Sequence, residues 1–283
     1  MSPTSATNLE GWVARHPYLE PLARLTAAVD AAAAGIEAPR VPIPAWDDYA
    51  ADFAEGFPLL RSEAAGVDLE PGGAIAVALA RSLSTRPAGG SPFAAIAELD
   101  AQLHRMPDAA GRVADWLLGD QSFDPVSPGL LRFLGWNAMA RYLSPLVASF
   151  AFWRTERWTR PSCPTCGSPP AMAQMIGAGT ENVRLRFLSC GLCGTRWKFA
   201  RTKCPFCESD SQRLDSVAVE GEAGLRIDYC ESCGGYLKTY DGTGNEDVLL
   251  SDWTSLHLDV VAHDRGLKRL AVSLYDLGSL LQP

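Results

Sequence analysis

The chain has 283 residues, a length that fits about two domains of ordinary size. Its 47% hydrophobic content is typical of a globular chain that buries a core, and it excludes the disordered and fibrous classes. With 25 basic and 33 acidic side chains the formal net charge is −8, so the whole chain lacks the basic character of a general nucleic-acid or membrane-surface binder.

The charges are segregated along the chain. Residues 1–150 carry ten arginines, no lysine and 17 acidic residues, whereas residues 153–203 carry nine basic residues against Glu156 and Glu181. The longest clearly apolar run, Tyr142 to Trp153, has twelve residues, and a membrane-spanning helix needs about 20. The N-terminal residues contain neither the basic nor the apolar segment of an export signal. We therefore expect no membrane insertion, a cytoplasmic location and reduced cysteines.

Residues 1–160 are predicted to form a helical domain. Apolar residues recur there at three- and four-residue steps within 46–57, 93–103 and 130–142. We expect Pro145 to kink or end the third of these helices. This part of the chain contains no phosphate-binding glycine loop, no zinc-protease motif and no nucleophile elbow. No catalytic residue is therefore predicted in this part of the chain, and its function cannot be read from motifs.

The eight cysteines all follow residue 160, and each belongs to a C-x-x-C pair. Alternation of apolar and polar residues within 183–187 and 225–229 predicts short strands between the pairs. The region also repeats itself, because the sequence CPTC at residue 163 matches CPFC at residue 204, and Cys190 matches Cys230. We therefore predict an α+β chain with two copies of one module, at 161–202 and 203–246, and a C-terminal helical tail at 247–283.

Each module spans only about 30 residues between its outer cysteines, and chains this short usually need a metal ion or disulfides to hold a fold. Two C-x-x-C loops can supply the four thiolates of a tetrahedral site. The repeat favours one metal site in each module, although an interleaved pairing of the middle two pairs is a conceivable alternative. The predicted ligands are Cys163, Cys166, Cys190 and Cys193 in the first site, and Cys204, Cys207, Cys230 and Cys233 in the second.

The identity of the metal stays open at this point, because four thiolates suit zinc and iron alike. The histidines are superfluous as ligands of such sites. His16 and His104 are isolated in the sequence and receive no role, since a lone histidine is most often an ordinary structural residue. His257 and His263 are expected to lie on a helix at Asp252–Arg265.

Three classes of function accommodate two tetrathiolate modules. The first is an assembly or chaperone-type binding protein, and the second is a rubredoxin-like electron-transfer or iron-redox protein. The third is a nucleic-acid-binding zinc ribbon, favoured by the basic interval but opposed by the net charge of −8. Thioredoxin-like chemistry needs a free thiol of low pKa, and here every cysteine is predicted to be a ligand.

Several segments together resemble one known family. They are CPTCG at residue 163, RLRFLSCGLCGTRWKF at 184, CPFCE at 204, YCESCGGYLKTYD at 229 and DWTSLHLDVVAHDRGLKR at 252. This arrangement of four cysteine pairs and a trailing helix closely resembles the FdhE family of formate dehydrogenase accessory proteins, over nearly the whole chain.

The resemblance implies a cytoplasmic protein that is not an enzyme. It implies two rubredoxin-like sites with iron as the bound metal, and binding of the catalytic subunit of a respiratory formate dehydrogenase before export. For the partner contact we expect an exposed surface that includes Arg184, Arg186, Trp197 and Arg201. The alternative is that Trp197 packs on the first module and that the arginines are solvated.

Overall fold

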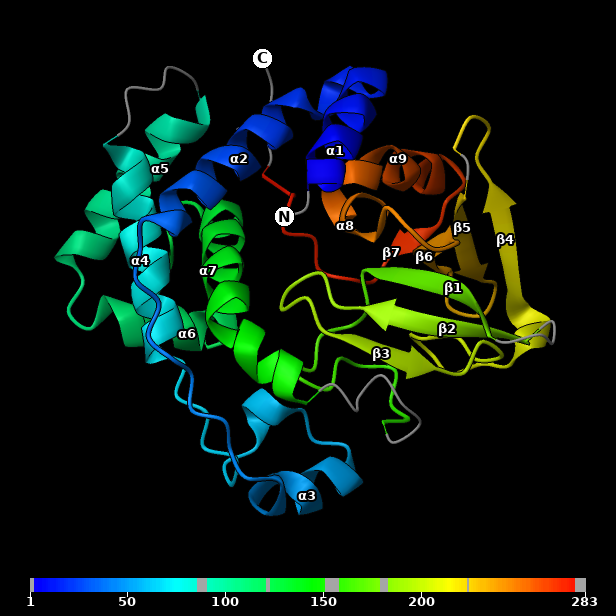
Figure 1. Ribbon diagram of the computed structural model, residues 1–283, viewed down its shortest axis with the longest axis horizontal. Coiled ribbons are helices and arrows are strands. Elements are labelled where there is room, and N and C mark those ends of the chain that lie inside the picture. Colours follow the sequence, from blue (N-terminus) through cyan, green and yellow to red (C-terminus); the bar gives the residue numbers. More distant parts are fainter. Residues whose placement is uncertain are drawn as a thin grey trace. The chain divides into compact units, whose positions relative to one another are not determined.

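The computed structural model describes residues 3–85, 91–120, 123–150, 158–178, 183–222 and 224–277, and the chain folds into two compact units. The sheet unit contains Met1–Leu19, Trp46–Ala64 and Phe150–Ser273. The helical unit contains Glu20–Ala45, Ala65–Ser149 and Leu274–Pro283. The α+β fold, helical first and then mainly strands, is confirmed (Figure 1). The domain boundaries after residues 160, 202 and 246 were placed from the sequence repeat, and they remain a prediction.

The helical unit is built around one helix, α4. The unit contains α2 (Glu20–Ala34), α4 (Glu70–Ser84), α5 (Ser91–Arg105), α6 (Ala109–Leu117) and α7 (Pro128–Ser149), and α4 packs against all the others. At Gly73 a Cβ atom would lie 2.0 Å from the carbonyl oxygen of Ala110, so the glycine lets α4 and α6 approach closely. The predicted apolar stripe on α5 is confirmed, because Ile96, Leu99 and Leu103 are buried.

Helix α7 continues through Pro145 to Ser149, so of the two expected outcomes, a kink or an end at this proline, the end is wrong. The residues on either side of the proline explain this. Leu143 and Leu146 have no exposed surface, and burying each of them stabilises the helical backbone by about 1.5–3 kcal/mol. That gain offsets the cost of about 3 kcal/mol for a proline in a helix interior.

The sheet unit contains one continuous sheet. Its strands are β1 (Met172–Ala178), β2 (Val183–Ser189), β3 (Arg196–Phe199), β4 (Leu214–Ala218), β5 (Leu225–Cys230), β6 (Gly235–Asp241) and β7 (Lys268–Arg269). Their order is β3-β2-β1-β6-β5-β4, and β7 also pairs with β6. The first three strands and the next three each form an antiparallel meander, and these meanders are the two predicted modules.

The two modules are joined by a parallel pairing of β1 with β6, in which Met172 lies opposite Lys238 and Met175 opposite Asp241. The sequence repeat makes β1 equivalent to β4 and β3 equivalent to β6. The first strand of one module therefore pairs with the last strand of the other, and the repeat is continued head to tail. Hydrogen bonds across the join make the two modules one rigid sheet.

Short helical elements complete the sheet unit. They are α1 (Pro3–Arg15), η1 (Pro17–Leu19), α3 (Trp46–Glu55), η2 (Leu59–Arg61), η4 (Ser211–Arg213), α8 (Glu246–Leu249), η5 (Asp252–Ser255) and α9 (Leu256–Asp264). The predicted helix at Asp252–Arg265 is thus present as η5 and α9, which lie beside β5 and β7 (Figure 1). Helix α3 ends before Gly56, whose φ of +86° suits a glycine that terminates a helix.

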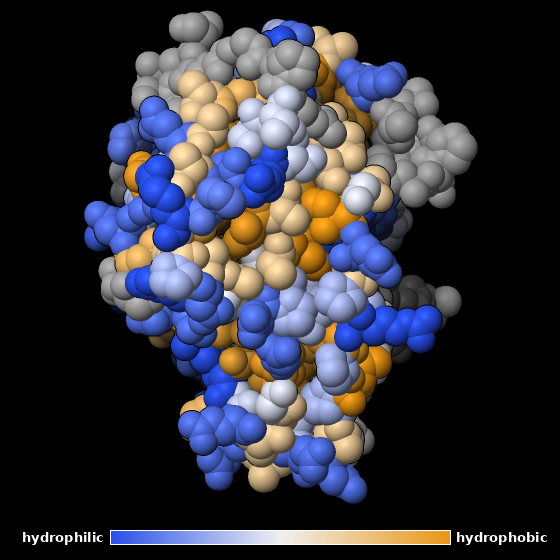
Figure 2. Space-filling view, turned by 90° about the vertical axis from the view of Figure 1, so that its left-hand side faces the viewer, coloured by the Kyte–Doolittle hydropathy of each residue, from blue (hydrophilic) through white to orange (hydrophobic). Residues whose placement is uncertain are grey.

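Among the described helices, none is long and apolar enough to cross a membrane. The longest, α7, carries Arg132 and Arg141 within its 22 residues. Figure 2 shows one face of the molecule, on which hydrophilic side chains separate several small apolar areas. The basic residues Arg154 and Arg157, part of the interval noted in the sequence, lie outside the described residues.

A buried network of charges fixes α9 to the sheet. The ammonium group of Lys238, on β6, lies 2.6 Å from Asp252 and 2.9 Å from Asp259. Arg269, on β7, lies 2.6 Å and 2.8 Å from the same two carboxylates, and the hydroxyl of Tyr236 donates to Asp259. Lys238 is only 1% exposed. Its charge is compensated inside the protein, since ion pairs and two backbone carbonyls surround it.

Replacement of Asp252 by alanine should destabilise the sheet unit strongly. The side chain of Asp252 is 5% exposed, and its removal leaves Lys238 and Arg269 with one carboxylate between them. Loss of one partner from a buried ion pair costs about 3–5 kcal/mol. Thermal unfolding of the metal-loaded protein measures the effect, with Asp264→Ala as the control because Asp264 is exposed at the end of the following helix, α9. Equal unfolding midpoints for the two variants would contradict this account of the network.

Candidate metal centre

Each C-x-x-C pair forms a tight turn, and the turn is repeated four times with the same backbone hydrogen bond. The amide of the residue after the pair donates to the carbonyl oxygen of the first cysteine, over 2.8–3.3 Å. That residue always has a positive φ, which brings the two sulfurs to one side of the turn. The residues are Gly167 (φ +80°), Gly194 (+74°), Glu208 (+58°) and Gly234 (+70°). Glu208 takes the same conformation without being a glycine.

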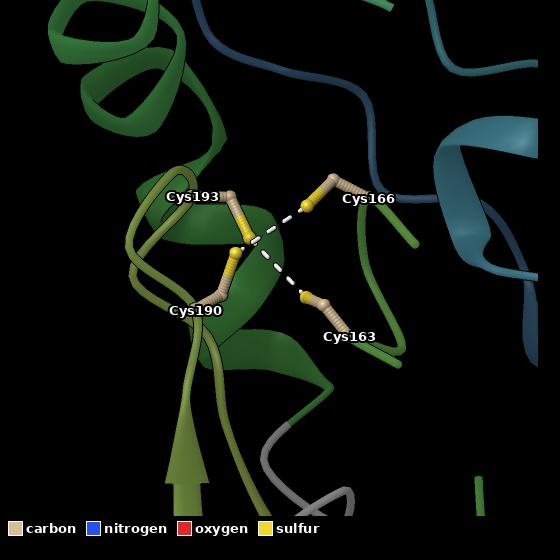
Figure 3. A group of neighbouring side chains, drawn as sticks. All are labelled: Cys163, Cys166, Cys190 and Cys193. Carbon is tan, nitrogen blue, oxygen red and sulfur yellow. Dashed lines mark hydrogen bonds between the residues drawn. The ribbon is translucent and has the colours of Figure 1, made fainter. Parts of the chain in front are cut away.

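The first cluster forms where the turn before β1 meets the turn between β2 and β3 (Figure 3). The sulfurs of Cys163 and Cys193 are 3.5 Å apart, and those of Cys166 and Cys190 are 3.4 Å apart. All four side chains are buried and point toward one another (Figure 3). The structure brings together the four cysteines that the repeat assigns to the first module, so an interleaved pairing does not occur.

The second cluster has the same construction with different exposure. The sulfurs of Cys204 and Cys233 are 3.8 Å apart, and those of Cys207 and Cys230 are 3.7 Å apart. Cys207 is exposed and Cys233 is partly exposed, whereas the other two are buried. The four ligand atoms lie within 4.8 Å of one another, as they do in the first cluster.

The sulfur positions fit a tetrahedral metal ion. With metal–sulfur bonds of about 2.3 Å, two thiolates on a tetrahedral ion lie about 3.8 Å apart. The observed separations of 3.4–3.8 Å are close to that value. A disulfide would place two sulfurs about 2.05 Å apart, and all eight cysteines are free. The clusters therefore have the donor set and the spacing of closed four-sulfur sites.

Backbone amides support several of the sulfurs. Leu192 donates to the sulfur of Cys190, Phe206 to that of Cys204, and Gly235 to that of Cys233, each over 3.4 Å. Hydrogen bonds of this kind favour the thiolate form that a metal ion requires. The sequence spacing does not show them, because they depend on the turn conformation.

The two clusters differ at one matched pair of positions. In the first, the hydroxyls of Thr165 and Thr195 are hydrogen-bonded over 2.7 Å and are buried. The repeat places Phe206 and Gly235 at these positions in the second cluster. A Cβ atom at Gly235 would lie 3.1 Å from the ring of Phe206, so the large residue occupies the space that the glycine leaves. A polar link between two turns in one module is thus an apolar contact in the other.

A segment from the first half of the chain covers the first cluster. The amides of Leu59 and Leu60, in η2, donate to the carbonyl oxygens of Pro164 and Thr165 over 2.8 and 2.9 Å. The hydroxyl of Tyr49, in α3, donates to the carbonyl oxygen of Phe57 and shapes the same segment. Figure 3 shows chain from this region beside the Cys166 turn. The sequence does not signal this cover, because residues 46–64 read as part of a separate helical domain.

The surroundings of the thiols make their ionisation unequal. Burial raises the pKa of Cys163, whereas hydrogen bonds from Cys163 and its neighbours hold the pKa of Cys166 well below its usual range. Burial raises the pKa of Cys204 to about 12. Burial opposes ionisation of Cys230 too, but hydrogen bonds from the Ser209 hydroxyl and nearby backbone amides lower its pKa to about 6. Four thiolates this close repel one another, so full ionisation needs a cation among them.

Two of the four residues expected on an exposed contact surface are buried, and the expectation is wrong for them. Trp197 has no exposed surface and lies on β3 inside the first module. Arg186 is 5% exposed, because its guanidinium group donates to the carbonyl oxygens of Ala200 and Lys203 and lies over the ring of Phe199. Arg186 therefore ties the link between the modules to β2.

The other two arginines lie at the surface. The side chain of Arg184 is 43% exposed and pairs with Asp241 on β6. Arg201 is exposed and lines a cavity of about 250 Å³ beside the second cluster. Cys204 and Cys230 form part of the wall of this cavity, as do Asp228 and Tyr229. The second cluster thus borders a polar recess.

Sequence reasoning missed a third group of ligand-type residues, formed by His16, Glu222 and His257 in the sheet unit. The three come from distant parts of the chain, and no local motif connects them. Only their shared proximity in the fold could have revealed the group.

The difference in cover predicts that the two sites release metal at different rates. A chelator should remove the ion of the second cluster first, because Cys207 is exposed there and all four sulfurs of the first cluster are buried. Zinc release is followed with a colorimetric chelator. Cys163→Ser, which keeps only the second cluster intact, should retain the fast phase of zinc release. Cys230→Ser, which keeps only the first cluster intact, should lose that phase. A single release rate for both clusters, or the reverse assignment, would refute the inference.

Comparison with known proteins gives related results from sequence and structure. The family model for the central domain of FdhE matches residues 162–201. An FdhE homologue of Pseudomonas aeruginosa is 36% identical over 193 residues, which are 64% of this chain and 62% of that protein. An FdhE homologue of Aquifex aeolicus is 34% identical over 152 residues, half of each chain. These alignments thus span less than two thirds of the relatives' lengths.

A solved structure extends the similarity over most of the chain. The crystal structure of the FdhE protein from Pseudomonas aeruginosa superimposes with a TM-score of 0.60 and 27% sequence identity. The superposition covers 91% of this chain and 88% of that one. The matched range of the family model contains the first cysteine cluster, and the superposition extends to both units. The chain thus resembles FdhE proteins in sequence and in fold.

Proposed function

We propose that each cysteine cluster binds one metal ion and that the chain is an accessory protein for the assembly of formate dehydrogenase. The observation that carries the first part is the convergence of four sulfurs, 3.4–3.8 Å apart, in each module. When bound, the ion supplies a cross-link between two turns. The ligands are the eight cysteines named from the sequence.

The geometry of the two clusters favours a structural role for the metal ions. Four protein sulfurs complete a tetrahedral shell and leave no coordination position for a substrate, in contrast to catalytic zinc sites. Binding of a structural zinc ion by a small domain contributes about 10–16 kcal/mol of apparent free energy at neutral pH. We propose iron or zinc as the ion, with iron favoured by the family resemblance and no preference from the donor set.

The assembly role rests on the similarity to FdhE proteins. Accessory proteins of this family are expected to act in the cytoplasm, without catalysis, on the catalytic subunit of a respiratory formate dehydrogenase before its export. The surface beside the second cluster is the region of this chain that we assign to the contact. Arg201 and Cys207 are exposed there, Arg184 is partly exposed on β2, and the neighbouring cavity is polar.

A rubredoxin-like redox function is the second candidate. The exposure of Cys207 favours it, because electron transfer requires a close approach to the metal site, and the first cluster lacks such exposure. Iron in the second cluster would supply a one-electron couple, visible as a thiolate-to-iron absorption band that bleaches on reduction. A nucleic-acid-binding role receives less support, since Arg186 and Trp197 of the basic interval are buried.

Serine substitution in either module tests the proposal. Cys163→Ser and Cys230→Ser should each lower the bound metal by about one ion per chain, because removal of one thiolate opens the shell. Each should also reduce formate dehydrogenase activity in cells that depend on this protein. Metal is measured by elemental analysis of anaerobically purified protein. Retention of all metal in both variants would exclude the ligand assignment. Metal loss with unchanged dehydrogenase activity would exclude the assembly role alone.

A further inference from the structure

Two histidines and a glutamate meet in the sheet unit, away from the cysteine clusters. His16 lies between α1 and η1, Glu222 lies in the loop between β4 and β5, and His257 lies in the first turn of α9. The Nε2 atom of His16 is 2.7 Å from Oε1 of Glu222, and Nε2 of His257 is 3.0 Å from the same oxygen. Two imidazole nitrogens thus converge on one carboxylate oxygen.

The other nitrogen of His16 shows where its proton lies. Nδ1 is 3.0 Å from the carbonyl oxygen of Trp12, and because a carbonyl only accepts hydrogen bonds, Nδ1 is the donor. In the neutral ring the lone pair is then on Nε2 and faces Glu222. A lone pair and a carboxylate oxygen at 2.7 Å repel each other unless a proton or a metal ion lies with them. Metal-binding histidines commonly have such a carbonyl behind them.

His257 is a buried ring without hydrogen bonds. Among the described residues, neither of its ring nitrogens has a hydrogen-bond partner, although both are inaccessible to solvent. Its Nε2 is near Glu222 but is not directed at it as a donor. Buried polar atoms are nearly always paired, and an unpaired one in a native protein often marks a bound water or ion. Burial also lowers the pKa of His257, which favours the neutral ring.

The aromatic surroundings hold the two rings in place. The imidazoles of His16 and His257 are stacked, with centroids 5.0 Å apart and an interplanar angle of 22°. Trp12 lies against His16 at 4.4 Å, and its indole N–H donates to the carbonyl oxygen of Thr254. Protonation of both rings would place two positive charges this close together, beside a single carboxylate. One cation shared by both rings and Glu222 avoids that repulsion.

We propose that His16, Glu222 and His257 form a third metal site, which binds a divalent transition-metal ion of the zinc type. Two imidazoles and one carboxylate are an established donor set for such ions, with bonds of about 2.0–2.2 Å. Ligands on a tetrahedral ion with these bonds lie about 3.3–3.5 Å apart. The observed 2.7 and 3.0 Å require a small outward adjustment of the side chains. The three side chains are 13%, 10% and 19% exposed, so the site lies just below the surface.

Such an ion would connect three segments that are far apart in the sequence. It would hold the turn after α1 and the loop between β4 and β5 against α9, without any cysteine. The site is independent of the proposed assembly role, because its ligands belong to neither cysteine cluster.

Equilibrium dialysis of the full chain against Zn²⁺ tests the site. The protein is first loaded with zinc, dialysed against a metal-free buffer, and then equilibrated with micromolar Zn²⁺ before elemental analysis. We expect three zinc ions per chain in the native protein, and two in His16→Ala, His257→Ala and Glu222→Gln. His263→Ala is the matched control, because His263 is exposed on the same helix as His257, and it should bind three.

Binding of the third zinc ion should also raise the thermal unfolding midpoint of the native protein above that of its two-ion form. The same rise is expected in His263→Ala and not in Glu222→Gln. Glu222→Gln is nearly isosteric, and retention of the two cysteine-bound ions shows that the variant is folded. Binding of only two ions by the native protein overturns the proposal. Binding of a third ion by all three ligand variants overturns it too.

Discussion

The structure depends on sulfur atoms from two turns meeting at one point, twice. Each module has three short strands and little core of its own, so its turns must be cross-linked if the strands are to keep their register. The separations of 3.4–3.8 Å within the clusters are those of a shared ion and not of disulfides. Four repetitions of one turn, each closed by a residue with positive φ, bring the sulfurs there.

The two modules share this construction but differ in what covers them. Backbone hydrogen bonds from η2 cover the first cluster, and the hydroxyls of Thr165 and Thr195 join its turns. In the second cluster, Phe206 and Gly235 take the places of these threonines. Its Cys207 is exposed, and a polar cavity borders the cluster. The parallel pairing of β1 with β6 makes the modules one sheet. A buried cysteine cluster and a more exposed one thus belong to one sheet.

Much of this arrangement was predictable from the sequence, because it rests on local patterns. The spacing of the C-x-x-C pairs and the repeat of about 40 residues predicted which cysteines meet in each cluster. Alternation of apolar and polar residues predicted β2 and β5. Glycine follows three of the four pairs, where a positive φ is needed, and Glu208 shows that the turn also forms without a glycine. The prediction of an apolar stripe on α5 was correct as well, because the three- and four-residue spacing of a helix is also a local signal.

The features that were missed depend on long-range packing. Nothing near Trp197 or Arg186 in the sequence decides whether they are buried. Arg186 was expected to be exposed in either case, whereas burial of Trp197 in the first module was the alternative left open, and both residues are buried. The cover from residues 46–64 and the meeting of His16, Glu222 and His257 join segments up to about 240 residues apart. Pro145 was judged by its local preference, but the burial of its neighbours decides the helix.

The most direct test of the central claim is mass spectrometry of thiol alkylation during gradual metal removal. If four sulfurs hold one ion, loss of that ion frees four thiols together. Under conditions where alkylation is faster than metal loss, the main species should carry zero, four or eight labels per chain. Accumulation of species with one, two or three labels would contradict the account. So would cysteines that resist alkylation after chelation and unfolding without a reductant, because these would be disulfides.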